Sequence, residues 1–220
     1  MPYDAVIFDL DGTLLDTEAM HIEAALLAKA QMGLMPDRPL LESMCGKDSG
    51  TCAGLMLAAY PGLDIAEFDA VLLKEIERLE AISIPLKPGV VALLDMIDVL
   101  GLPCAVATSS CQDRAVKKLR ISGLTNRFQT VVTVNCVSNP KPAPDPFLLV
   151  AERLGVRPDR CLAFEDSDPG TISAHAAGMI VVQVPDIAPA RTDKAHHLAK
   201  TLLDGACLAG LIPSPCESLI

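Results

Sequence analysis

The stretch that decides the fold is VIFDLDGT, residues 6–13. It opens with a short apolar run that contains β-branched side chains, which predicts a buried strand, and Gly12 marks the end of that strand. Two carboxylates, Asp9 and Asp11, follow one residue apart. Strand side chains alternate between faces, so these two would share a face only if the backbone stayed extended through Leu10. The pair favours a metal site or a nucleophile with an acid–base partner; the alternative is a solvated Asp-Gly turn.

The bulk composition describes a globular, acidic chain. Of the 220 residues 50% are hydrophobic and 21% are charged, a balance typical of folded proteins. The formal net charge of -10 and the lack of a Lys/Arg cluster disfavour a nucleic-acid partner. The eight cysteines form no Cys-x-x-Cys pair, which favours a reducing compartment, and Asp95 and Asp98 interrupt the best candidate for a membrane span. We expect a cytoplasmic protein without a signal peptide or membrane segment.

Residues 17–85 carry only helical periodicity and turn signals. Helices are expected to start at Thr17, after Asp37 and at Asp64, with a loop at 46–50. Outside this segment the pattern alternates strand and helix, which predicts a parallel sheet with helices on both faces. The later strands are expected at 103–107, 130–133, 161–164 and 179–184. The helices between them are expected at 87–100, 110–121, 144–154 and 167–177, and the tail from Asp193 is expected to be helical.

The predicted organisation is a Rossmann-like α/β core with an inserted all-helical cap. The core comprises residues 1–16 and 86–220, and the cap domain comprises residues 17–85. An insert that follows the first strand must lie above the carboxyl end of that strand, which is where open α/β sheets bind ligands. We therefore expect the cap to cover Asp9 and Asp11 as a lid.

Two of the later strand ends carry groups suited to binding an anion. Thr108 and Ser109 stand where a strand runs into a helix, so their hydroxyls and free amides could hold an anion, or a serine could simply cap the helix. Lys141 lies in a proline-rich loop at a helix entrance, where a cation opposes the helix macrodipole. An anionic neighbour would explain this lysine, and the alternative is a solvated surface side chain.

Adjacent acids, Glu165 and Asp166, follow the strand at 161–164. Either acid could cap the next helix. With Asp9 and Asp11, however, they place four carboxylates at one edge of the sheet, where mutual repulsion raises pKa values unless a cation lies among them. Oxygen ligands in an incomplete cage fit Mg²⁺, which retains water and shares a substrate phosphate.

The four stretches together resemble the haloacid dehalogenase (HAD) superfamily. Residues 9–13, Asp-Leu-Asp-Gly-Thr, are similar to its first motif, Thr108 to its second, Lys141 to its third, and Glu165-Asp166 to its fourth. Their order and their placement at strand ends also fit. The helical insert resembles the cap of the subgroup that contains β-phosphoglucomutase and many sugar-phosphate phosphatases.

The resemblance implies a mechanism for the acidic residues. Asp9 would attack phosphorus and form an aspartyl-phosphate. Asp11 would protonate the leaving oxygen and then activate the water that hydrolyses the intermediate. Mg²⁺ would be held by Asp9, the backbone carbonyl of Asp11, and Asp166, with Glu165 supporting the site directly or through water.

The resemblance also implies a phosphate-binding set. Thr108 and Lys141 would hold phosphoryl oxygens and offset the charge of the transition state, while Gly12 would let backbone amides approach the phosphate. The full predicted set for phosphate and substrate is Gly12, Thr108, Ser109, Lys141, His21 and Lys47.

Departures from the mutase pattern favour a phosphatase. Asp11 itself argues against a dehalogenase, because those enzymes lack this second acid. Thr17 and His21 are shared with the start of the mutase cap, where His21 could orient Asp11 or merely pack in its helix. The mutase arginine that grips a distal phosphate has no equivalent at 46–50, although Lys47 lies there, and Cys111-Gln112 replaces a Lys-Asn pair.

The sequence therefore predicts a Mg²⁺-dependent phosphatase for a small phosphorylated metabolite, a sugar or polyol phosphate. A phosphosugar mutase is the alternative, and a non-catalytic HAD-like binding module is a third hypothesis. The expected assembly is a monomer or a small homo-oligomer. The cap loop that would select the substrate does not reveal which metabolite binds.

Overall fold

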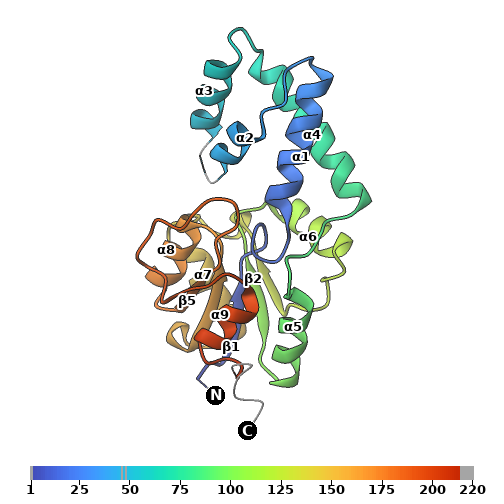
Figure 1. Ribbon diagram of the computed structural model, residues 1–220. Coiled ribbons are helices and arrows are strands. Elements are labelled where there is room, and N and C mark those ends of the chain that lie inside the picture. Colours follow the sequence, from blue (N-terminus) through green and yellow to red (C-terminus); the bar gives the residue numbers. More distant parts are fainter. Residues whose placement is uncertain (1, 46, 48, 214–220) are drawn as a thin grey trace.

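The computed structural model describes residues 2–45, 47 and 49–213. A parallel sheet forms its centre, below a stack of helices (Figure 1). All its strand pairs are parallel, so their carboxyl ends meet at one edge. In spatial order the strands are β3 (Thr130–Val132), β2 (Cys104–Ala107), β1 (Ala5–Phe8), β4 (Cys161–Glu165), β5 (Ile180–Gln183) and β6 (His197–Leu198).

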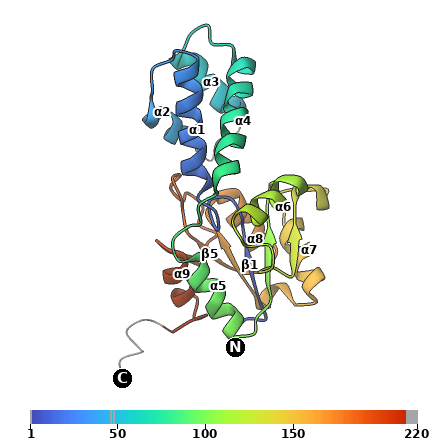
Figure 2. The same ribbon diagram turned by 90° about the vertical axis from the view of Figure 1, so that its right-hand side faces the viewer.

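The central strand β1 shows why both faces of the sheet are covered. Its side chains alternate, so Val6 and Phe8 lie in one apolar cluster and Ala5 and Ile7 in another, all fully buried. The helices contributing to the first cluster are α5 (Val90–Val99), α6 (Gln112–Ile121) and α9 (Leu202–Leu208). Those contributing to the second are α7 (Asp145–Leu154) and α8 (Asp168–Ala176), while the 3₁₀ turns η1 (Val134–Cys136) and η2 (Pro158–Arg160) lie in the connections. Figure 2 shows α5 and α9 on one side of the sheet.

The position of β1 places its carboxyl end at the switch point of the sheet. Chain order runs outward from β1 to β2 and β3 on one side, and to β4, β5 and β6 on the other. Ligands bind at such reversals in open α/β sheets. The register with β4 pairs Phe8 with Phe164, whose rings stack at 5.1 Å between centroids. The residues that follow Phe8 and Phe164 therefore emerge side by side.

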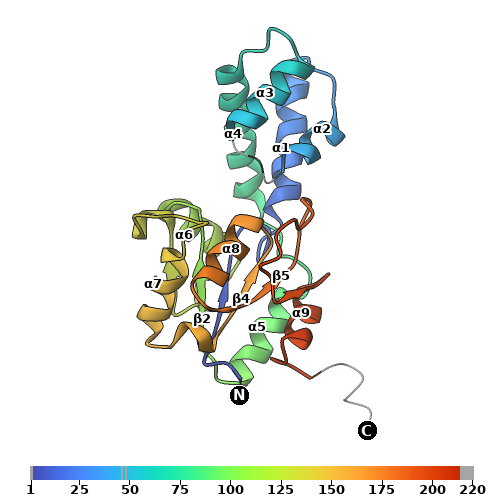
Figure 3. The same cartoon turned by 90° about the vertical axis from the view of Figure 1, so that its left-hand side faces the viewer.

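In the part of the chain that the structure describes, the helices between β1 and α5 form an insert above the carboxyl edge of the sheet (Figures 1 and 3). They enclose their own apolar cluster, which includes Ile22, Leu41, Met56 and Phe68. Asp37 and Asp64 cap two of them by accepting backbone amide hydrogen bonds. The helices are α1 (Thr17–Gln31), α2 (Arg38–Met44), α3 (Ser49–Ala59) and α4 (Ile65–Ile82). The predicted fold class, an α/β core with an inserted helical cap, is confirmed.

The two connections between core and cap run side by side. The Asp16 amide donates to the Pro85 carbonyl at 2.9 Å, and Leu15 forms an antiparallel bridge with Leu86. We propose that the domain boundaries lie here, with a cap of residues 17–85 and a core of residues 1–16 and 86–220. Beyond the connections, Glu80 of α4 pairs with Lys117 of α6 at 3.0 Å, which ties the cap to the core.

Several local predictions need correction. The tail from Asp193 is not a continuous helix, because His197 and Leu198 form β6 against β5 and α9 begins only at Leu202. The helix expected from 110 begins at Gln112. Residues 46 and 48 of the predicted cap loop lie outside the described residues, and α3 already begins at Ser49.

The structure also bears on the expectations about membrane spans and cysteines. Within that part of the chain, no helix combines the length and the apolar character that crossing a membrane requires. The seven cysteines described there form no disulfide bonds with one another, and Cys216 lies outside the described residues.

Candidate active site

The end of β1 and the end of β4 place two acids on the same face of the sheet. Asp9 continues the alternation of Ile7, and Glu165 continues that of Ala163, so both point toward the side covered by α7 and α8. The loop that leads into α7 carries Lys141. The alternation along the strands therefore brings both carboxylates to this lysine.

Lys141 is a buried cation between two acids. Its ammonium donates to Asp9 Oδ1 at 2.5 Å and to the Ala107 carbonyl at 2.8 Å, and it pairs with Glu165 Oε1. Its side chain is only 4% exposed. Burial acts to lower the pKa of Lys141, but the charges of Asp9 and Glu165 outweigh burial and the pKa is raised. The hypothesis of an anionic neighbour for this lysine is thus confirmed, and the solvated alternative is wrong.

Asp166 lies against the turn that follows β1. Thr13 donates its hydroxyl to Asp166 Oδ1 at 3.0 Å. Gly12 has a φ of 85°, and a Cβ on it would lie 2.5 Å from Asp166 Oδ2. Glycine is therefore required at this position, both for the left-handed backbone and for the close approach of the acid.

Asp9, Glu165 and Asp166 form a group of carboxylates that could hold a metal ion. One oxygen of each lies within 4.8 Å of the others. Burial, more than the repulsion among them, raises the pKa of Asp9 to about 7 despite the opposing effect of Lys141. Burial, followed by repulsion from Asp9 and Glu165, also raises the pKa of Asp166 well above its ordinary value. Lys141 alone therefore does not neutralise the three carboxylates, and their oxygen atoms and remaining negative charge fit a Mg²⁺ ion.

Asp11 is held by a different cation. Its Oδ1 lies 2.5 Å from the Lys118 ammonium, and its Oδ2 accepts the Ser110 hydroxyl at 2.7 Å. Burial acts to raise the pKa of Asp11, but the charge of Lys118, followed by hydrogen bonds from Lys118, Ser110 and Thr17, lowers it overall. Among the described residues the Asp11 carboxylate does not join the group around Asp9. The predicted metal contact through its backbone carbonyl stays a prediction.

The predicted anion-binding residues have distinct surroundings. Thr108 is buried and its Oγ1 accepts the Ser110 amide at 3.0 Å, while Ser109 is exposed. The Gly12 amide donates to the Leu15 carbonyl at 2.8 Å, so in this conformation it is already paired. The geometry gives Gly12 a role in shaping the turn, and its predicted contact with phosphate stays a prediction.

A cleft of about 730 Å³ joins these groups to the cap. His21 and Lys47 contribute to it from the cap, and burial, followed by the charge of Lys118, lowers the pKa of His21. Gly12 and Glu165 are the two predicted site residues that do not line it. Those that do are Asp9, Asp11, His21, Lys47, Thr108, Ser109, Lys141 and Asp166.

The predicted set of site residues left out several charged or polar residues of the cleft wall. Ser110, Arg114 and Lys118 all line it. A signal for Lys118 did exist, because it falls between Ala115 and Leu119 on the buried stripe of α6. A buried lysine on an apolar stripe needs an anion as its partner, and Asp11 is that anion.

The raised pKa values make Mg²⁺ binding sensitive to pH. Carboxylates must lose their protons to bind the ion, so the affinity for Mg²⁺ should fall as the pH drops below about 7, the pKa of Asp9. In the metal-free protein the folded state retains a proton on Asp9 that the unfolded chain releases, so the stability that Asp9 contributes is lost as the pH rises from about 4 to about 7. Calorimetric titration with Mg²⁺ across this range tests the prediction, and an affinity independent of pH would contradict it.

Comparison with known proteins agrees with this geometry. A sequence profile of the haloacid dehalogenase-like hydrolases matches residues 6–184, a range that begins in β1 and ends just after β5. The chain belongs to this family. The predicted membership in the HAD superfamily and the predicted hydrolase class are therefore confirmed.

Three individual proteins illustrate the similarity. The chain is 37% identical over 187 residues to fructose-1-phosphate phosphatase YqaB of Escherichia coli, covering 83% of this chain and 96% of that protein. It is 34% identical over 192 residues to hexitol phosphatase A of the same organism, covering 87% of each. A Thermotoga maritima protein provisionally assigned as a β-phosphoglucomutase has a similar structure, with a TM-score of 0.79, 28% identity, and coverage of 99% of this chain and 100% of that chain.

Proposed function

We propose that this HAD-like hydrolase is a Mg²⁺-dependent phosphatase that releases phosphate from a small phosphorylated sugar or polyol. The observation that carries the proposal is the buried Lys141 between Asp9 and Glu165 at the floor of a cleft shared with the cap. The two Escherichia coli relatives are named for fructose 1-phosphate and for hexitol phosphates, which supports a carbohydrate phosphate as substrate.

In the first half of the reaction, Asp9 acts as nucleophile. A carboxylate oxygen of Asp9 attacks phosphorus, the ester P–O bond breaks, and the leaving oxygen receives a proton from Asp11, which must first take that proton up from solvent because its lowered pKa keeps it ionised in the free protein. The product is an aspartyl-phosphate on Asp9 and a free sugar or polyol. Lys141, which contacts Asp9, and Thr108, which lines the same cleft, hold phosphoryl oxygens and offset the charge that builds up on them.

The second half regenerates the enzyme. Asp11 takes a proton from a water molecule whose oxygen attacks phosphorus, and the bond between Asp9 and phosphorus breaks to release inorganic phosphate. Asp9, Asp166 and the Asp11 carbonyl would hold the Mg²⁺, supported by Glu165. When bound, the ion neutralises the carboxylates and the phosphate so that an anionic nucleophile can approach an anionic substrate.

The mutase alternative is not favoured. A mutase must hold two phosphates at once, and the sequence departs from the mutase pattern at 46–50 and at Cys111-Gln112. Lys47, the cation of this cap segment, donates to the Ser43 carbonyl on the preceding helix. The two Escherichia coli relatives are both named as phosphatases.

A substrate panel tests the proposed function. With Mg²⁺, the protein should release inorganic phosphate from fructose 1-phosphate or a hexitol phosphate, and excess chelator should abolish the release because the carboxylate group loses its cation. Isomerisation of a hexose 1-phosphate in the presence of a bisphosphate primer, without net release of phosphate, would support the mutase instead. Full activity in excess chelator would show that phosphate release does not require Mg²⁺.

A further inference from the structure

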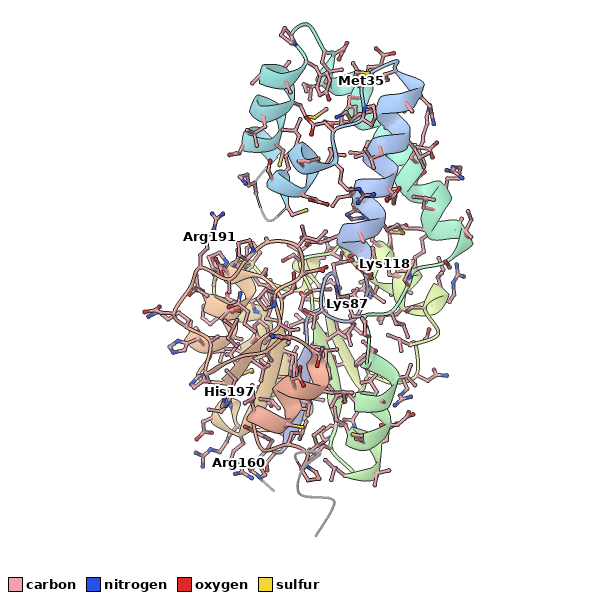
Figure 4. All side chains as sticks on the ribbon, viewed as in Figure 1. Met35, Lys87, Lys118, Arg160, Arg191 and His197 are labelled. Atoms are coloured by element: carbon pink, nitrogen blue, oxygen red, sulfur yellow. The ribbon has the colours of Figure 1, made fainter. Side chains whose placement is uncertain are left out.

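Lys118 is a buried ammonium whose described ion pair is with Asp11. Its side chain is 2% exposed, and its Nζ lies 2.5 Å from Asp11 Oδ1. Figure 4 shows Lys118 where α6 of the core meets the base of the cap. Burying an ammonium is unfavourable unless an anion pairs with it, so the position of each group depends on the other.

The contacts of Asp11 define the orientation of its carboxylate. Lys118 holds one oxygen and the Ser110 hydroxyl holds the other at 2.7 Å, and both residues belong to the core. Thr17, at the start of α1, adds a further hydrogen bond to this carboxylate. The Asp11 side chain is still 29% exposed, and Asp11 and Lys118 line the same cleft. Hydrogen bonds thus hold the Asp11 carboxylate in place, while part of its side chain remains open to the cleft.

From this geometry we propose that Lys118 is a positioning residue that aims the Asp11 carboxylate at the leaving oxygen of the substrate. The inference rests on the proposed function, because it assumes that Asp11 transfers the proton. Proton transfer in the transition state requires the acid to lie within hydrogen-bond reach of the leaving oxygen. Without the ammonium, one oxygen of Asp11 loses its partner and the side chain can rotate away.

Leaving groups of different acidity separate positioning from a general structural role. An alkyl phosphate needs a proton on its leaving oxygen, whereas p-nitrophenyl phosphate has a leaving group that departs as an anion. Lys118→Met should lower kcat/KM for the alkyl phosphate by on the order of 10²-fold, with only a few-fold loss for the aryl phosphate. Asp11→Asn should show the same selective loss. Arg120→Met removes an exposed cation from the same helix and should leave both values unchanged.

Each contrary outcome is distinct. An equal loss of kcat/KM for both substrates would mean that Lys118 binds the phosphate or merely supports the fold. An unchanged or increased value for the alkyl phosphate would mean that Lys118 does not aim Asp11 productively. Either result would overturn the proposal while leaving the phosphatase function intact.

A stability cycle tests the coupling without using activity. Asp11→Ala leaves the Lys118 ammonium buried without its partner and should lower Tm, and adding Lys118→Met should restore most of that loss. Additive changes in Tm would overturn the proposal. If the wild-type protein hydrolyses no phosphate but the cycle is non-additive, the proposed function fails while the pairing of Lys118 with Asp11 stands.

Discussion

Asp9→Asn should abolish turnover while leaving the fold intact. The amide oxygen of asparagine cannot attack phosphorus as a carboxylate does, so kcat/KM should fall by on the order of 10⁴-fold or more. Stability should be unchanged or slightly higher, because the substitution removes one negative charge from the buried group with Glu165 and Asp166. Phosphate release and thermal unfolding, measured on the same preparation, test both parts.

The control for this variant is Asp4→Asn. Asp4 lies just before β1 and pairs with Arg160 at the surface, at 2.8 Å, so its loss should leave both turnover and Tm essentially unchanged. Mass spectrometry should confirm that the asparagine introduced by Asp9→Asn has not reverted to aspartate by deamidation. Wild-type turnover by the intact Asp9→Asn protein would exclude Asp9 as the nucleophile.

Lys141→Met should eliminate activity and also destabilise the fold. Removing the ammonium leaves Asp9 and the fully buried Glu165 without their shared cation, and breaking such a buried pair costs about 3–5 kcal/mol. Mg²⁺ should restore part of the stability, because it supplies positive charge to the same carboxylates. Thermal unfolding with and without Mg²⁺, together with phosphate release, measures these effects.

Two further variants separate the effect of Lys141 on stability from its effect on activity. The double variant Lys141→Met/Glu165→Gln should regain much of the lost stability, because one of the unpaired charges is gone, but it should remain inactive. Lys194→Met removes a lysine that is 47% exposed and paired at the surface, and it should change neither property. A Lys141→Met protein as stable as wild type would contradict the role assigned to the buried ion pair.

Much of this architecture could be predicted from local patterns. The apolar run before Asp9, and the alternation of strands and helices beyond residue 86, led to the parallel sheet because each pattern reflects burial on one or two faces. The tail could not be predicted in the same way. His197 and Leu198 become a strand only because the edge of β5 is available to pair with them, and that pairing depends on how the whole sheet is assembled.

The sequence by itself determined the order of the four motifs and their positions at strand ends, because strand periodicity and breaker residues are local properties. From that order followed the proximity of Asp9 and Asp166 and the expectation of an anion near Lys141, whereas the burial of Lys141 between two acids came only from the tertiary structure. Only the tertiary structure decided which cation each aspartate of the first motif contacts. The chain turns after Leu10, and α6 packs with Lys118 facing inward, so Asp9 pairs with Lys141 while Asp11 pairs with Lys118. That choice depends on the direction of side chains from elements far apart in the chain, which no local pattern contains.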